Sequence, residues 1–290
     1  MASLKEVKSR ITSVISTQQI TKAMKMVAAA KLRKSQERIT QMRPFALKLS
    51  QLFQNLSAAE QDNQAWYNQQ REENKILLVV ISSDRGLCGG FNSTIIKAAI
   101  RLATEKYPTQ YAKGNVTMLP LGKKGFEFFG KKNYPMVSDH WNIFSSLSYA
   151  RASETGDYLM NSFKSGSFDK IEIIYNEFKN VATQILRTEQ FLPVVAAKKN
   201  TKVTGTDYIY QPNEAEIIAG LVPKSLKTQL YKALLDSNAA ENGARMTAMD
   251  KATENAGDLL KDLKLTYNRT RQAAITKEIL EIVAGAEALK

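Results

Sequence analysis

The sequence predicts an α/β protein in which two long helices, one at each end of the chain, flank a central domain of strands and helices. Apolar residues recur at helical spacing over both terminal regions, and short apolar runs alternate with helical segments between them. The length of 290 residues allows a domain plus an extended element. Hydrophobic residues make up 43% of the chain and charged residues 24%, which is enough apolar material for a folded core.

The N-terminal region carries an apolar seam over residues 4–56. Its positions are spaced alternately three and four residues apart, which is typical of a helix in a coiled coil. Polar residues interrupt the seam at Gln18, Thr21 and Lys25. The neighbouring face instead carries the apolar residues Ile20, Met24 and Val27. A local adjustment of the coiled coil is the simpler interpretation, and contact of this face with another molecule is the alternative.

The C-terminal region predicts a second long helix, which begins near Pro212. A ridge of small residues at four-residue spacing lets another helix come close, and it consists of Ala240, Ala244, Ala248, Ala252 and Ala256. Prolines predict two irregularities, because proline has no N–H to donate and clashes with the preceding turn. Pro44 should bend the first helix, and Pro223 should divide a short helix from the long one.

Each terminal helix has an apolar stripe that it cannot bury alone, so we expect the two helices to pair as a long antiparallel coiled coil. The second helix is longer, and its apolar tip over residues 275–289 should therefore project alone and need burial by another protein. The predicted divisions are an N-terminal helix over 1–57, a linker over 58–74, a central α/β domain over 75–206 and a C-terminal helix over 207–290.

The middle of the chain predicts a Rossmann-like α/β domain. Strands are expected at 75–83, 116–121, 136–138, 169–175 and 183–191, and helices at 94–106, 123–131 and 148–163. Strands that alternate with helices favour a sheet covered by helices on both faces. Residues 195–206 should form an exposed loop.

The central domain offers few residues for chemistry. Asp84–Gly90 follows the first strand, but its glycines do not fit the dinucleotide-binding fingerprint, and Gly122–Gly125 does not fit a Walker motif. A tight turn explains these glycines better. Cys88, the only cysteine, should be a small buried residue, and a single histidine, His140, leaves no Cys/His set for zinc. The sequence therefore predicts no catalytic, cofactor-binding or metal-binding residues.

The formal net charge is +13, and residues 1–57 hold eleven Lys and Arg against two Glu. Such a basic helix suits an acidic partner. A nucleic-acid-binding coiled coil is one alternative function, although Phe53 is the only aromatic residue in this region. A cofactor-dependent α/β enzyme is another. A mitochondrial presequence fits less well, because the helical pattern is about twice too long. The longest aliphatic run, residues 76–81, is too short to cross a membrane.

Three stretches of the chain resemble the gamma subunits of F-type ATP synthases, and the resemblance extends over essentially the full length. They are ITKAMKMVAAAKLRKSQ at 20–36, SDRGLCGGFN at 83–92 and NRTRQAAITKEILEIVAGAE at 268–287, of which the third is the most specific. The regulatory cysteine pair of the chloroplast form is missing. Met1 comes directly before the helical pattern, which favours a bacterial form.

The resemblance implies a rotor shaft inside a ring of three alpha and three beta subunits, standing on the ring of c subunits beside epsilon. Proton flow would turn the c ring and the shaft, and the shaft would drive the beta subunits through their nucleotide-binding states. The chain itself would be non-catalytic and bind no nucleotide or nucleic acid. It would lie at the cytoplasmic face of the cell inner membrane as a peripheral protein.

The resemblance also implies particular contacts. The positions that match beta-subunit contacts are Met24, Lys25, Arg271, Gln272 and Thr276, and an acidic beta-subunit loop would suit the basic first helix. The positions that match a foot facing the c ring are Tyr208 and Gln211, of which the second stands where a glutamate is familiar in the family.

Overall fold

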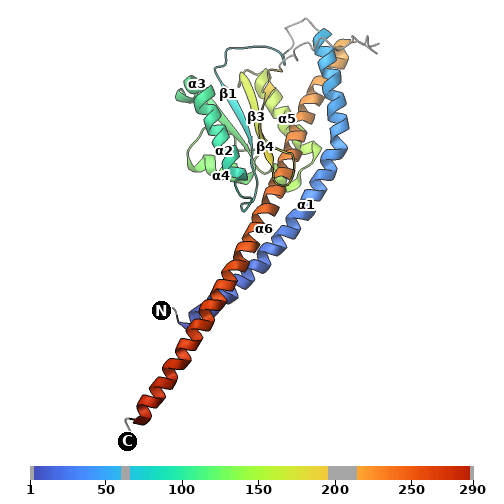
Figure 1. The fold of residues 1–290 in the computed structure, drawn as a ribbon. Coiled ribbons are helices and arrows are strands. Elements are labelled where there is room, and N and C mark those ends of the chain that lie inside the picture. The colour runs from blue at the N-terminus through green and yellow to red at the C-terminus, as the bar shows by residue number, and fades with distance from the viewer. Residues whose placement is uncertain (1–2, 60–65, 195–213, 288–290) are drawn as a thin grey trace. The chain divides into compact units, whose positions relative to one another are not determined.

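The computed structural model describes residues 3–59, 66–194 and 214–287. The chain divides into two compact units, one formed by Met1–Ala29 with Arg245–Lys290 and the other by Ala30–Ala244. Two long helices contribute to both units (Figure 1). These helices are α1, Leu4–Ala59, and α6, Glu214–Glu287.

Both long helices continue through their internal prolines. The predicted division of the C-terminal helix at Pro223 is wrong, because α6 is a single helix over this residue. A proline inside a helix costs about 3 kcal/mol, whereas burial of one Val or Leu side chain contributes about 1.5–3 kcal/mol. Val222 and Leu226, on either side of the proline, are both buried, and their burial offsets this cost. α1 is likewise one helix through Pro44.

The second unit contains a four-stranded sheet with the strand order β2-β1-β3-β4. Its strands are β1 (Ile76–Ile81), β2 (Val116–Leu121), β3 (Lys170–Phe178) and β4 (Gln184–Leu192). β1 pairs in parallel with β2 and β3, and β4 pairs antiparallel with β3. All six residues of β1 are apolar and fully buried, as a parallel strand between two covering layers requires.

Helices cover both faces of the sheet, as the sequence predicts (Figure 1). The longer ones are α2 (Phe91–Arg101), α4 (Lys123–Lys131) and α5 (Tyr149–Lys164), and the short ones are η1 (Leu102–Lys106), α3 (Pro108–Ala112) and η2 (Ile143–Ser146). The helix expected at 94–106 thus ends in a separate turn of π-helix, η1. The strand expected at 136–138 is wrong, since only a single bridge joins Met136 to Met118 at the edge of β2.

The second unit has a hydrophobic core on each face of the sheet, and α6 contributes to both. One core combines residues of β1 and α5 with Leu230 and Leu234 of α6. The other combines residues of β1 and α2 with Leu235 and Ala239 of α6 and with Leu32 of α1. α6 is therefore an integral part of this domain as well as a terminal helix.

α1 and α6 run antiparallel wherever they contact each other. In the first unit Lys25 lies opposite Asp250, and Thr21 lies opposite Thr253, so residue numbers rise along one helix and fall along the other. In the second unit the Ser35 hydroxyl donates to the Asn238 side chain over 2.7 Å. The antiparallel pairing expected from the two apolar stripes is confirmed within each unit.

Candidate functional site

Among the described residues of the first unit, no helix lies alongside the C-terminal end of α6. The register of Thr21 opposite Thr253 places Leu4, the first residue of α1, opposite a position near Thr270. Every residue over 271–287 is exposed. The large apolar side chains of this segment are 48–71% exposed, and they are Ile275, Ile279, Leu280, Ile282 and Val283. A contiguous set of exposed apolar side chains marks an interaction surface.

Three predicted contact residues lie at the start of this exposed segment. Arg271, Gln272 and Thr276 are all exposed. The Thr276 hydroxyl donates to the Gln272 carbonyl oxygen over 2.9 Å, so these two residues stack one helical turn apart. Arg271 forms no ion pair with any described residue, and its guanidinium group is free to bind a partner. The structure thus brings the three polar residues together beside an apolar surface.

The two predicted contact residues of α1 lie in a polar layer between the helices of the first unit. The Lys25 ammonium group pairs with the Asp250 carboxylate at 2.5 Å, and both side chains keep more than a third of their surface exposed. Gln18 donates to the backbone of Thr253, and the hydroxyl of Thr253 donates to that of Thr21 over 2.8 Å. The polar interruptions of the seam are therefore paired across the coiled coil.

This polar layer adds two residues that sequence reasoning missed, Asp250 and Thr253. The polar seam residues of α1 already indicated that α6 should carry polar partners. The sequence does not give the register between the two helices, so these partners could not be identified. Beside the layer, Met24 is half-buried, whereas Ile20 and Val27 are more than half exposed. α1 thus presents an apolar face that α6 leaves uncovered in this unit.

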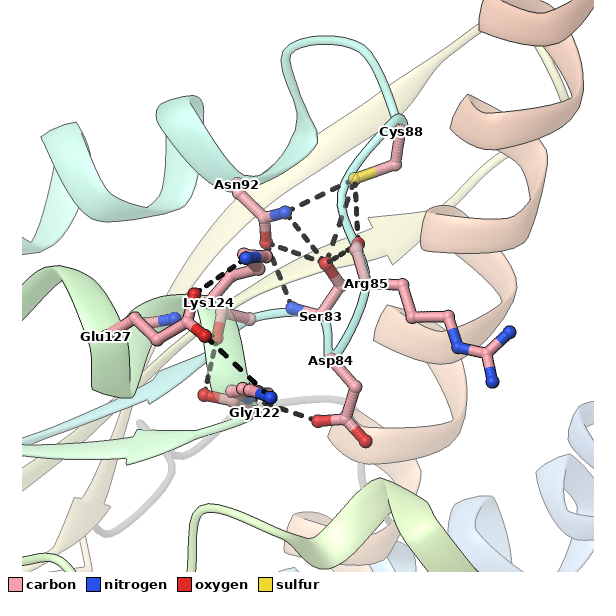
Figure 2. A network of polar contacts seen from close by, with 11 residues as sticks. Ser83, Asp84, Arg85, Cys88, Asn92, Gly122, Lys124 and Glu127 are labelled. Atoms are coloured by element: carbon pink, nitrogen blue, oxygen red, sulfur yellow. Dashed lines mark hydrogen bonds and ion pairs between the residues drawn. The ribbon is translucent and has the colours of Figure 1, made fainter.

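The glycine-rich loop after β1 forms a compact polar network (Figure 2). The Ser83 hydroxyl donates to the Arg85 carbonyl oxygen and accepts from the Asn92 side chain, both over 2.7 Å. Asp84 accepts from the backbone N–H of Lys123 at the start of α4. Cys88 is buried with its sulfur 3.3 Å from the Asn92 amide nitrogen, which confirms it as a small buried residue. The network holds the loop against the starts of α2 and α4.

A second glycine turn follows β2, and it brings two segments of backbone into close approach. Gly122 has a φ of +122°, and a Cβ atom there would lie 2.2 Å from the Ser82 carbonyl oxygen. The Ser82 hydroxyl also accepts from the backbone N–H of Gly125 over 2.9 Å. These glycines therefore serve the packing of β1 against α4, as the tight-turn interpretation predicts.

Helix α6 fills the place where a sheet of this topology usually binds a ligand. β1 connects to β2 on one side, while β3 lies on the other, and ligands of open α/β sheets bind at the carboxyl ends of strands at such a switch point. Here the Ser237 hydroxyl donates to the carbonyl oxygen of Ile81, the last residue of β1. The adjacent Leu235 packs in the core. α6 therefore packs against the carboxyl end of β1.

His140 is held as a packed side chain. It lies 3.4 Å from the Thr155 hydroxyl and its ring contacts that of Tyr158. Burial lowers the pKa of His140, although Asp139 and Glu154 oppose this effect. No group of three His, Cys, Asp or Glu side chains in the described ranges is arranged to hold a metal ion. Tyr208 and Gln211, the predicted foot residues, lie outside the described residues.

None of the helices that the structure describes is both long and apolar enough to span a bilayer.

Comparison with known proteins gives matches over the whole chain. A family model described as ATP synthase matches residues 3–289. The chain is 55% identical over 294 residues to the ATP synthase gamma chain of Cytophaga hutchinsonii, and the match covers 100% of this chain and 99% of that one. It is 50% identical over 291 residues to the ATP synthase gamma chain of Chlorobaculum tepidum, with 100% of both chains covered.

Solved structures give the same fold. A chain of the Euglena gracilis mitochondrial ATP synthase, from a structure of its OSCP, F1 and c-ring, matches with a TM-score of 0.70 at 20% identity and covers 99% of this chain and 94% of its own. A chain of the Tetrahymena thermophila mitochondrial ATP synthase, from its central stalk and c-ring, matches with a TM-score of 0.58 at 25% identity, over 80% of this chain and 99% of its own. From the whole-length identity to curated relatives, the chain belongs to the family of ATP synthase gamma chains.

Proposed function

We propose that the chain is the central rotor shaft of a proton-translocating ATP synthase, which couples rotation of the c ring to the conformational cycle of the catalytic beta subunits. The observation that carries this proposal is the C-terminal end of α6, where every residue from 271 to 287 is exposed. An exposed apolar helical end of this kind marks an interaction surface. A ring of three alpha and three beta subunits would supply the surfaces that cover it.

Two surfaces of the chain would contact the beta subunits. Arg271, Gln272 and Thr276 form a hydrogen-bonding group that suits a polar loop, and a hydrogen bond to a charged group contributes about 1.5–3 kcal/mol. Met24 lies next to the exposed apolar residues Ile20 and Val27. Lys25 can reach an acidic loop only if it shares or leaves its pairing with Asp250. We therefore rank Arg271 above Lys25 as a contact residue.

The remaining assignments follow from the same role. Tyr208 and Gln211 would belong to a foot on the c ring beside epsilon, and the chain would be held at the cytoplasmic face of the inner membrane through the complex. Residues 1–57 and 207–290 would serve as the shaft helices, 58–74 as a linker and 75–206 as the central domain. The chain would have no active site of its own, which fits a switch point filled by α6.

The test is the double variant Arg271→Ala with Gln272→Ala in the complete ATP synthase. We expect a several-fold loss of ATP-driven proton pumping in membrane vesicles, together with impaired ATP hydrolysis or reduced subunit content. The matched control is Arg269→Ala, which removes a neighbouring exposed cation of the same helix. Pumping, hydrolysis and subunit content are measured on the same vesicles.

Wild-type values of all three quantities in the double variant would remove these residues from the mechanism. An equal loss in Arg269→Ala would mean that general positive charge matters, and it would contradict a specific contact by Arg271. We expect that a strain lacking the whole chain assembles no coupled ATP synthase. Normal coupling in such a strain would contradict the shaft role itself.

A further inference from the structure

A partly open cavity of about 790 Å³, lined by both apolar and charged side chains, lies within the second unit, where α1, β4 and α6 meet. One face of α6 lines it through residues spaced four apart: Thr228, Lys232 and Asp236. α1 contributes Arg43, and β4 contributes Glu189. We call this space the junction cavity. It plays no part in the contacts assigned above.

Asp236 is the exceptional residue of the junction cavity. Its side chain is buried, with 2% of the residue exposed, and its Oδ1 atom has no hydrogen-bond partner among the described residues. The Thr228 hydroxyl, two helical turns away on the same face, is also buried without a partner in the described part of the chain. A buried carboxylate without donors is costly when it is charged, because burial removes water that would stabilise the charge.

Charged groups face Asp236 from each element around the cavity, but none within the described ranges forms an ion pair with it. Lys232 on α6 and Arg43 on α1 favour its charged form, whereas Glu177 on β3 and Glu189 on β4 oppose it. Glu177 is engaged by Arg187 at 2.7 Å. Glu189 accepts hydrogen bonds from the Tyr175 hydroxyl and the Gln229 amide, both of them neutral donors. Glu189 forms no ion pair with any described residue, and its charge opposes the charged form of Asp236.

The balance of these effects favours the protonated acid. Burial, the largest cause, raises the pKa of the Asp236 carboxyl to about 6, from an ordinary value of 3.8. The folded chain therefore takes up a proton as the pH falls through about 6, while the unfolded chain does so only near 4. Between these values the folded state gains stability as the pH falls. At neutral pH the carboxylate is charged, and the cost of burying this charge destabilises close packing of α1, β4 and α6 around it.

We propose that Asp236 makes the meeting point of α1, β4 and α6 a proton-sensitive joint, which is looser while this carboxylate is charged and tighter when it holds a proton. The elements that would respond are the stretch of α1 around Arg43 and the stretch of α6 around Thr228 to Asp236. Water would approach the Asp236 carboxyl more closely in the charged form than in the neutral form.

The test compares hydrogen exchange in the wild-type chain and Asp236→Asn, both within the assembled complex, with rates corrected for the intrinsic effect of pH. The peptides cover residues 38–49 and 222–240. At about pH 7.5 we expect the variant to exchange roughly tenfold more slowly than wild type in both peptides. At about pH 5 the two should exchange equally, because the wild-type acid is then mostly protonated.

The matched control is Asp157→Asn, which removes a half-exposed acid that pairs with Lys227 of α6 outside the cavity. It should leave the pH dependence of both peptides unchanged. If Asp236→Asn does not assemble, the wild-type complex tests the proposal by itself. Its hydrogen-exchange rates, corrected for the intrinsic effect of pH, should fall several-fold in both peptides from about pH 7.5 to about pH 5. Faster exchange in Asp236→Asn at about pH 7.5, or no pH dependence in wild type, would overturn the proposal.

Discussion

Two stretches of the same helix have similar apolar composition and opposite burial. Leu230 and Leu234 of α6 are 0% exposed, because the sheet and α5 cover them within the second unit. Leu280 and Ile282, near the other end of α6, are 63% and 71% exposed. Helical propensity and hydropathy do not separate these stretches. What separates them is whether the rest of the chain supplies a covering surface, so the exposed stretch is explained by a partner outside the chain.

The difference also shows how one helix can serve two purposes. The stretch around Leu234 stabilises the domain that α6 is part of, and burial of each such side chain contributes about 1.5–3 kcal/mol. The stretch around Leu280 contributes nothing of this kind to the isolated chain, so its apolar residues are retained at a risk of aggregation. Matched leucine substitutions in the two stretches therefore test the comparison directly.

The largest effect is expected for Leu234→Ala. The substitution leaves a cavity in the core on the α5 side of the sheet and should lower the free energy of unfolding of the full chain by about 2–5 kcal/mol. Urea unfolding followed by circular dichroism measures this change. A change of less than about 1 kcal/mol would mean that α6 does not form part of that core in solution.

Leu280→Ala, the matched substitution in the exposed stretch, should change the free energy of unfolding of the chain by less than about 0.5 kcal/mol. It should instead weaken assembly, because the side chain is available only to a partner. Subunit content of purified complexes measures the second effect. If Leu280→Ala destabilised the isolated chain as strongly as Leu234→Ala, the contrast between the two stretches would be lost.

Lys25→Glu should have only a small effect on stability, because exposed ion pairs contribute about 0.2–1 kcal/mol. This substitution separates the pairing of Lys25 with Asp250 from a contact with an acidic partner. Adding Asp250→Lys restores an opposite-charge pair within the chain. Recovery of ATP-driven pumping in the double variant would assign Lys25 to the internal pair alone, whereas continued loss would support the external contact.

Local patterns predict the elements well, because each depends on residues close in sequence. The seam over residues 4–56 predicts α1, and the apolar run at 75–83 predicts β1. The errors arise where distant packing decides. Pro223 is tolerated because the neighbouring Val222 and Leu226 are buried. The short strand at 136–138 is reduced to one bridge, since only Met136 aligns with Met118.

The candidate site was predictable to a similar extent. The exposed end of α6 could be foreseen, because the second helical pattern outruns the first. The pairing of Lys25 with Asp250 could not, since these residues are 225 positions apart and their register depends on the whole connecting domain. The packing of α6 at the carboxyl end of β1 could not be predicted either, because no local sequence pattern places Ser237 beside Ile81.

The contribution of α6 to both cores has a consequence for how the protein is made. Ser237 contacts Ile81 across 156 positions, and Asn238 contacts Ser35 across 203. During synthesis from the N-terminus, the strands and α1 are therefore finished well before α6, and the part of their apolar surface that α6 covers stays exposed in the growing chain. Contacts of such long sequence separation form slowly and leave the chain open to aggregation. The last quarter of translation thus sets the earliest moment at which the domain can fold completely and become available for assembly.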